Sequence, residues 1–364
     1  MRLCLLTLLC LLTAEAAATL PSLKDTLRRY EIREGDTAAY TLNLALDRAG
    51  RPKYFFRNIF TPVCNTGECR PVYINLYWDL LGNYLRYDLP GDEVLTKTDH
   101  RDFKEEDYRK LQDILAKESS IFSELKMEDL VVKGTENISD SANVRTGATL
   151  KTIRNEVIEG AVFTCYTLWH FAHGGTTEQI KNITDSLETP AMLHNFLRSG
   201  NHHYQYWAMD KVMDADGKVQ PGYEEDIAGV IRGKNIFTAR YALQKVHPDY
   251  FEPSKRQDWL WTAYHKASYP LQMTILKKLS DITVTDKLCN KIAATITEGN
   301  REQLKAKLKI LSARPKLPVK TQQLLAEQLS HPGMGEDIYQ ALKQLKQADA
   351  SVRQKISAYE KKNE

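Results

Sequence analysis

The sequence predicts an α+β N-terminal domain followed by an all-helical domain. Two observations predict this division: short β-rich aromatic segments occur only in the first part of the chain, and from Thr176 onward the apolar residues recur with helical period. A third is length, because 364 residues exceed what a single hydrophobic core usually serves. We expect a leader over residues 1–18, an α+β domain over 19–175 and a helical domain over 176–364.

The leader has the order of a secretory signal peptide. Arg2 precedes an apolar run from Leu3 to Leu12, and small residues follow from Ala14 to Ala18, so cleavage is expected near Ala17 or Ala18. The run is too short to span a membrane. Leu9 stands before Cys10 where a lipoprotein signal would carry a small residue. We therefore expect export to a bacterial periplasm, without a lipid anchor or a transmembrane segment.

The charge of the chain indicates which partners to exclude. The formal net charge is +3, and the basic residues do not gather into a long stripe. Nucleic-acid-binding proteins usually show such a stripe, because phosphate contacts supply much of their affinity. Nucleic acid is therefore not the expected partner.

The expected elements of the N-terminal domain follow in chain order. Residues 54–60, 72–78 and 84–87 read as strands of an antiparallel meander, with the turn Gly82-Asn83 before the third. A polar helix is expected from about Lys104 to Glu118, entered through Asp102, and then a loop over 139–145. A long amphipathic helix should run from Leu150 to His173 and end at Gly174-Gly175.

Four cysteines remain beyond the leader. Cys64 and Cys69 flank the four-residue hairpin loop 65–68, so in an oxidising compartment they are expected to form a structural disulfide. A redox-cycling pair is the alternative, although the C-x4-C spacing is not that of thioredoxins. Cys165 and Cys289 lie within apolar helical faces and are expected to be free, buried thiols.

The second half resembles HEAT-type repeats in helix length and spacing, although no repeat consensus is found. Gly, Pro and Asp turns separate the segments, which predicts antiparallel helices stacked as a solenoid. Helices are expected near residues 186–198, 200–213, 223–246, 255–267, 269–280, 286–297, 301–312, 318–330, 334–347 and 349–361.

The candidate site is a short run before the expected long helix. A phosphate ester needs backbone donors and positive charge, and a helix N-terminus supplies both. Gly147 permits close backbone approach, Ala148 leaves it unobstructed, and Thr149 would stand at the helix start. The alternative is that Thr149 is only an N-cap. The residues concerned are Arg145, Thr146, Gly147, Ala148, Thr149, Lys151 and Arg154.

The run from Asn143 to Thr149 resembles the flavinylation motif of the FMN-binding-domain family, D-x-x-[S/T]-G-A-[T/S]. Asn143 stands where the family usually carries Asp. The resemblance, over roughly residues 35–175, implies an FMN-binding-like fold. It also implies FMN joined through its phosphate to Thr149 by a flavin transferase. Such proteins pass electrons between partners, so a redox partner protein is expected.

Other interpretations remain open. A flavin-free binding or scaffold protein could hold a peptide or protein in the groove of the helical half, and Asn143 favours this alternative. His170 and His173, with Cys165 and Trp169 on the same helix, could be metal or haem ligands, but they lack a recognised spacing. His202-His203 reads as a polar helix start, or as part of a groove facing a flavin.

Overall fold

The computed structural model describes residues 26–34, 38–63, 69–97, 100–130, 139–140, 143–144 and 156–363. The chain divides into two compact units, Met1–Glu188 and Thr189–Glu364. The division falls beyond the boundary after residue 175 that the sequence suggested, because helix α3 (Gly175–Ser186) packs against the first unit. The Thr184 hydroxyl in α3 donates to the carbonyl of Leu80, in a turn of the first unit.

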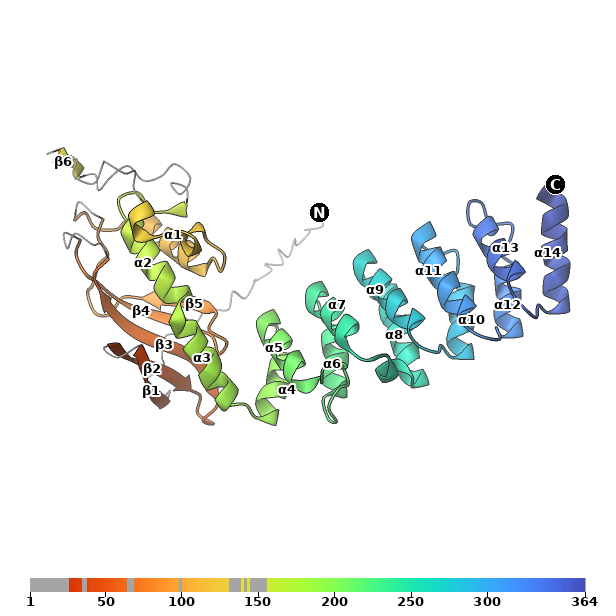
Figure 1. Cartoon of the computed structure of the whole chain (residues 1–364), viewed down its shortest axis with the longest axis horizontal. Coiled ribbons are helices and arrows are strands. Elements are labelled where there is room, and N and C mark those ends of the chain that lie inside the picture. Colours follow the sequence, from red (N-terminus) through yellow and green to blue (C-terminus); the bar gives the residue numbers. More distant parts are fainter. Residues whose placement is uncertain are drawn as a thin grey trace, which may run out of the picture. The chain divides into compact units, whose positions relative to one another are not determined.

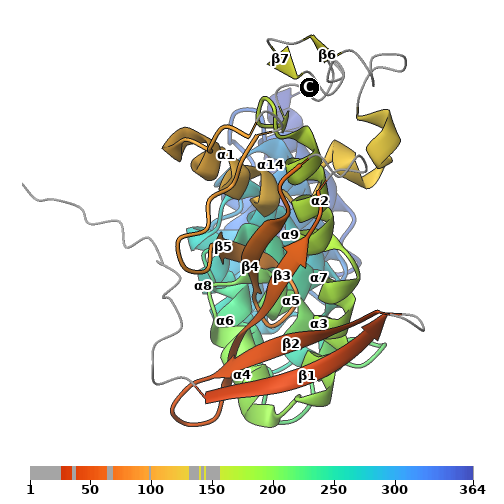
Figure 2. The same ribbon diagram turned by 90° about the vertical axis from the view of Figure 1, so that its left-hand side faces the viewer.

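The first unit is built on a five-stranded antiparallel sheet in the order β1-β2-β3-β4-β5. The predicted meander is confirmed as β3–β5, and β1 and β2 extend it (Figures 1 and 2). The strands are β1 (Thr26–Glu34), β2 (Ala38–Leu46), β3 (Pro52–Thr61), β4 (Val72–Trp78) and β5 (Tyr84–Asp88). Most residues of β1 that the structure describes are exposed and several are charged, so β1 lacks the apolar alternation that marks a half-buried strand.

One face of the sheet packs on helices. Phe55 and Trp78 are paired neighbours on β3 and β4, and both are fully buried. The Trp78 indole Nε1 donates to the carbonyl of Ala172 at 2.7 Å, near the end of helix α2 (Val162–His173). Arg57, on the same face, donates to the Thr176 hydroxyl at 3.0 Å. Figure 1 shows α2 and α3 following one another along this sheet.

Helix α1 spans Glu105–Ala116, within the predicted range, but it does not begin through Asp102. Its N-cap is Lys104, whose backbone N–H donates to the Asp107 carboxylate at 2.9 Å. Asp102 instead forms an isolated β-bridge with Thr96. The Asp107 carboxylate thus accepts a hydrogen bond from one of the N–H groups that have no partner within the helix at its start.

The helix expected from Leu150 to His173 is wrong in its first half. Residues 150–155 lie outside the described part, and Glu156–Ala161 are not α-helical. Gly160 has a φ of 76°, in the left-handed region that a right-handed helix cannot contain, so α2 begins only at Val162. Val157 and Ile158 are buried in a non-helical segment. Their apolar side chains matched the helical period in the sequence, but it is this burial, not a helix, that accounts for them. The predicted end at Gly174 is confirmed.

The second unit is helical, as predicted, and its helices form antiparallel hairpins stacked in series (Figure 1). The expected segment 223–246 is two helices, because the chain turns at Gly233 and the Asn235 side chain caps a new helix. The helices are α4 (Pro190–Arg198), α5 (His202–Val212), α6 (Glu224–Ile231), α7 (Ile236–Lys245), α8 (Ser254–Lys266), α9 (Tyr269–Ser280), α10 (Asp286–Ala294), α11 (Arg301–Ser312), α12 (Val319–Ala326), α13 (Gly335–Lys343) and α14 (Ala350–Asn363).

Ion pairs link the first helices of neighbouring hairpins at two places. Arg198 on α4 reaches Asp226 on α6 at 2.5 Å, and Lys291 on α10 reaches Asp258 on α8 at 2.6 Å. At these two junctions, charge contacts add to the apolar surface that neighbouring hairpins bury. No helix among the described residues is both long and apolar enough to cross a membrane.

Candidate functional site

Most of the predicted flavin site falls on residues that the structure does not describe. Asn143 is described: it lies in strand β7 (Asn143–Val144), where its backbone pairs with Asp140 of β6 (Ser139–Asp140). The other candidate residues lie outside the described part of the chain, so their geometry stays a prediction. They are Arg145, Thr146, Gly147, Ala148, Thr149, Lys151 and Arg154.

The chain after this segment is anchored to the first unit. Glu156 forms an ion pair with Lys117, just beyond the end of α1, and Val157 and Ile158 are buried. Glu156 follows Thr149 by seven positions, and an extended chain of that length spans at most roughly 25 Å. The Cα atom of Thr149 therefore lies within that distance of the Cα atom of Glu156.

The helix N-terminus expected at Thr149 is not supplied by α2. Its N-cap is Ala161, twelve positions further along, and Ala161 makes no side-chain capping hydrogen bond. The positive end of the α2 dipole therefore acts near Ala161. The nearby cations Arg145, Lys151 and Arg154 stay the predicted source of positive potential beside Thr149.

The polar face of α2 is occupied by backbone carbonyls. Four side chains at positions 166, 169, 170 and 173 donate to the segment Leu115–Leu125, which holds the end of α1 and the short helix η1 (Ile121–Ser123). The pairs are Tyr166 Oη with Leu125 O at 3.0 Å, Trp169 Nε1 with Lys117 O at 2.9 Å, His170 Nε2 with Phe122 O at 3.1 Å, and His173 Nε2 with Leu115 O at 2.8 Å.

These contacts fix the tautomers of the two histidines. A carbonyl oxygen can only accept, so Nε2 of His170 and Nε2 of His173 carry the hydrogens, and Nδ1 is the acceptor nitrogen of each neutral ring. Burial lowers the pKa of both imidazoles, against the hydrogen bonds to Phe122 and Leu115, which raise it. Within the described residues, no group of three His, Cys, Asp or Glu side chains could hold a metal ion.

The cysteines behave in part as expected. Cys165 and Cys289 are free and fully buried, which confirms the prediction for both. Burial raises the pKa of the Cys165 thiol to about 12 and that of the Cys289 thiol to about 11, so neither is a nucleophile at neutral pH. The Cys64–Cys69 disulfide stays a prediction, because Cys64 lies outside the described residues.

His202 and His203 begin α5, as the polar-start interpretation predicted. Asn201 is the N-cap, and its side-chain oxygen accepts from the backbone N–H of His203 at 2.9 Å. The two imidazole rings lie 3.9 Å apart, and His202 also meets the edge of the Tyr206 ring. Their placement is explained by the helix start.

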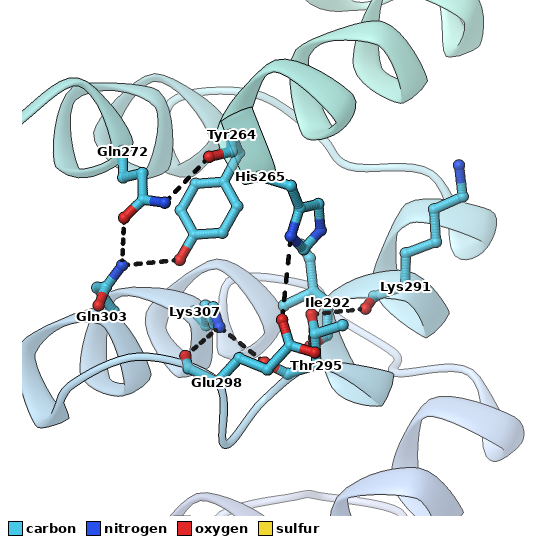
Figure 3. Close-up of polar contacts among 9 residues, drawn as sticks. All are labelled: Tyr264, His265, Gln272, Lys291, Ile292, Thr295, Glu298, Gln303 and Lys307. Atoms are coloured by element: carbon cyan, nitrogen blue, oxygen red, sulfur yellow. Dashed lines mark hydrogen bonds and ion pairs between the residues drawn. The ribbon is translucent and has the colours of Figure 1, made fainter. Parts of the chain in front are cut away.

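Helix α11 carries a buried lysine, a type of residue often found in functional sites, which the sequence did not indicate. Lys307 is fully buried, and its Nζ donates to the carbonyls of Thr295 and Glu298 at 2.7 and 2.8 Å (Figure 3). Burial lowers the pKa of Lys307 to about 8, against the opposing charge of Glu298. Only the helical period, which places Lys307 beside Leu304, Leu308 and Leu311 on the apolar face, could have indicated its burial.

The surroundings of Lys307 indicate a structural role. The two carbonyls lie just past the end of α10, where backbone acceptors lack helical partners, and a buried ammonium can satisfy them. Next to it, Gln303 donates to the Tyr264 hydroxyl at 3.0 Å and to Gln272 at 2.8 Å, which joins α11 to α8 and α9 (Figure 3). Lys307 bonds to the backbone, and the three side chains Gln303, Tyr264 and Gln272 bond to one another.

The chain was also compared with known proteins. No protein-family model matches it, and the search of curated proteins finds no match. The chain's own residues therefore carry the functional inference.

Proposed function

We propose that this chain is an exported flavoprotein that carries FMN on Thr149 and passes electrons between partners of the cell envelope. The observation that carries the proposal is the run Thr146-Gly147-Ala148-Thr149, preceded by Asn143, which resembles the flavinylation motif. On this view residues 19–175 form an FMN-binding-like domain, and the helical hairpins form a HEAT-like region that docks partners. The leader over residues 1–18 would direct export to the periplasm.

The chemistry of the candidate residues fits a phosphate-linked flavin. A threonine hydroxyl can form the phosphodiester, and Arg145, Lys151 and Arg154 place three cations within a few residues of it. The flavin would supply the redox chemistry, while the protein would set its exposure and surroundings. A covalent tether suits a protein outside the cytoplasm, because FMN lost there is not readily replaced.

The anchored flank limits how far the motif can lie from the first unit. The Lys117–Glu156 ion pair and the buried Val157 and Ile158 hold the chain that leaves the motif. The Lys117 side chain is about half exposed, so a partner that approaches this edge of the first unit meets solvent-accessible charge. Electron transfer is then expected at the surface of the first unit.

The direct test is the change Thr149→Val in protein produced with a flavin transferase. The expected result is a folded, colourless protein, because the acceptor hydroxyl is missing. Wild type should keep its flavin absorbance at about 450 nm after denaturation and removal of small molecules. Thr152→Val is the matched control, since it removes a hydroxyl from the same segment outside the motif and should keep the flavin.

Two outcomes would overturn the assignment. Flavin that stays attached to the Thr149→Val chain after denaturation would place the linkage elsewhere. A wild-type chain without flavin, despite an active transferase, would favour the second candidate function.

That second candidate is a flavin-free scaffold protein. Two observations favour it: Asn143 replaces the aspartate of the motif, and helical hairpins make up the second unit. Stacked helical hairpins offer extended surfaces suited to peptide or protein partners. Absorbance of protein purified from its own host separates the two functions, because only the flavoprotein is yellow.

A further inference from the structure

The second unit contains a cavity of about 710 Å³ between its first two hairpins. The turn from α4 to α5 forms one side, and α6 with the turn into α7 forms the other. Its volume lies within the range of about 300–1,000 Å³ typical of small-molecule sites. The lining residues that matter below are Arg198, Gly200, Gly229, Arg232 and Lys234.

Two glycines leave the cavity open where the fold does not require glycine. Gly229 lies inside helix α6, and a Cβ added there would meet no atom within 4 Å. The same is true of Gly200, and neither residue has a left-handed φ. Glycine inside a helix costs roughly 0.5–1 kcal/mol relative to alanine. The missing side chains therefore enlarge the cavity at a small cost in stability.

The cavity presents a guanidinium in a fixed orientation. Asp226 is buried, and its two carboxylate oxygens accept from Arg198 Nε at 2.5 Å and from His194 Nδ1 at 2.6 Å. This pairing holds the Arg198 side chain through Nε alone. Its two terminal nitrogens have no acceptor among the described residues, and the side chain is 66% exposed. They remain available to an external oxyanion.

Two further cations line the same cavity. Arg232 is held by its own helix, since its Nε donates to the carbonyl of Ala228 at 3.1 Å, and its nearest carboxylate is Glu225 at 3.8 Å. Lys234 follows in the turn and has no charged partner among the described residues. Two carboxylates also line the cavity. Asp226 is already bonded to Arg198 and His194, and the Glu225 side chain is 87% exposed, so the cavity holds more cationic side chains than unpaired carboxylates.

We propose that this cavity binds a small organic anion through a carboxylate or phosphate group. The terminal nitrogens of Arg198 match the two oxygens of such a group, because a guanidinium can donate two parallel hydrogen bonds. Lys234 and Arg232 add positive charge, and the open space beside Gly229 and Gly200 receives the rest of the ligand. The proposal does not depend on the flavin.

Calorimetric titration of the full chain at low salt is the test, with citrate and inorganic pyrophosphate as probes. We expect at least one probe to bind with one-to-one stoichiometry. The double change Arg232→Gln and Lys234→Gln should weaken that binding tenfold or more, because it removes two exposed cations without touching Asp226. Lys320→Gln, a charge loss at an exposed site on α12, is the matched control and should bind as wild type does.

A cavity-filling variant gives an independent measurement. Gly229→Leu should abolish binding while the thermal melt stays cooperative, and Gly229→Ala should keep binding within about threefold. Binding of citrate alone would assign a carboxylate ligand, and binding of pyrophosphate alone a phosphate ligand. The proposal is overturned if neither probe binds at millimolar concentration, or if the double charge variant and wild type bind equally.

Discussion

Gln257 and Gln322 make the same hydrogen bonds in two different hairpins. Gln257 in α8 donates to the carbonyls of Glu252 and Thr283, and its amide oxygen accepts from the backbone N–H of Thr285. Gln322 in α12 donates to Leu317 and Gln347 and accepts from Asp349 in the same way. Both side chains are buried. Each glutamine thus joins the loop before its own helix to a loop further along the chain. For Gln257 that loop precedes α10, and for Gln322 it precedes α14.

The first prediction concerns this clamp. Gln322→Leu keeps the side-chain volume but leaves the Leu317 carbonyl and the Asp349 N–H without partners. Unsatisfied buried groups cost about 1–3 kcal/mol each, so the free energy of unfolding should fall by at least about 2 kcal/mol. Urea unfolding monitored by circular dichroism measures the change. Gln323→Leu, at the exposed neighbour, should change stability by less than about 0.5 kcal/mol; equal losses would refute the clamp.

The same comparison explains why no repeat was visible in the sequence. Cys289 holds the equivalent position in α10, five residues after Val284, and it cannot supply the amide. Arg314 Nη1 instead donates to the Val284 carbonyl, from a helix end further along the chain. The repeated feature is a backbone carbonyl that needs a donor. Because different residues meet that need, the period does not appear as a repeated letter.

The second prediction concerns the pH dependence of stability around Lys307. Burial lowers the pKa of this lysine to about 8 from its ordinary value of 10.5, so between these values the unfolded chain binds more protons than the folded one. The free energy of unfolding of wild type should therefore rise with pH across this window, relative to Lys307→Met. The slope is at most about 1.4 kcal/mol per pH unit.

Urea unfolding at pH 7.5 and pH 9.5 provides the measurement. The difference between wild type and Lys307→Met should grow by about 1–2 kcal/mol over this interval. Lys309→Met, which removes an exposed lysine from the same helix, should show no such growth. Parallel curves for wild type and Lys307→Met would mean that Lys307 titrates normally in the folded chain.

The third prediction is the reactivity of the cysteines. Cys165 and Cys289 are fully buried with raised thiol pKa values, so an aromatic disulfide reagent should react with neither in the folded protein at pH 8. After denaturation without reductant, the exported chain should show two thiols, because Cys64 and Cys69 are expected to be bridged. Four thiols would contradict the bridge, and rapid labelling of the folded protein would contradict the burial.

The fourth prediction concerns Asn143. If the transferase recognises this position as it does the aspartate of the motif, Asn143→Asp should raise the fraction of chains that carry flavin. Absorbance of the denatured, desalted protein relative to its tryptophan absorbance measures that fraction. Asn143→Ala serves as the control and should not exceed wild type. Unchanged occupancy in Asn143→Asp would show that this position does not limit flavin attachment.

The fifth prediction is that the second unit folds alone. A fragment from Thr189 to Glu364 keeps every helix from α4 onward, and the Thr189 hydroxyl caps α4 by accepting from the Met192 N–H. It should therefore give a cooperative, helix-rich thermal melt without flavin. A fragment that begins at Pro190 and lacks this cap should melt at a lower temperature. An unfolded Thr189 fragment would show that the helices depend on the first unit.

Sequence and structure agree most where local signals are strong. The helices of the second unit begin at polar caps such as Thr285 and Asn300, and α11 spans the predicted 301–312. Disagreement arises where tertiary packing decides. Val157 and Ile158 are buried without being helical, and β1 gains its place by pairing with β2 despite its charged residues. The four carbonyl contacts of α2 could not be predicted, because their acceptors belong to the backbone of a distant segment.

The contacts between α2 and the segment Leu115–Leu125 depend differently on the amino-acid sequence of each side. The donors on α2 are side chains, so replacing Trp169 or His173 removes a bond outright. The acceptors are main-chain oxygens, which every amino acid carries. Lys117 could become another residue and still accept from Trp169. The segment after α1 can therefore change at exposed positions such as Lys117 and keep these bonds, whereas the buried Phe122 is held by its own packing and each donor on α2 by its side chain.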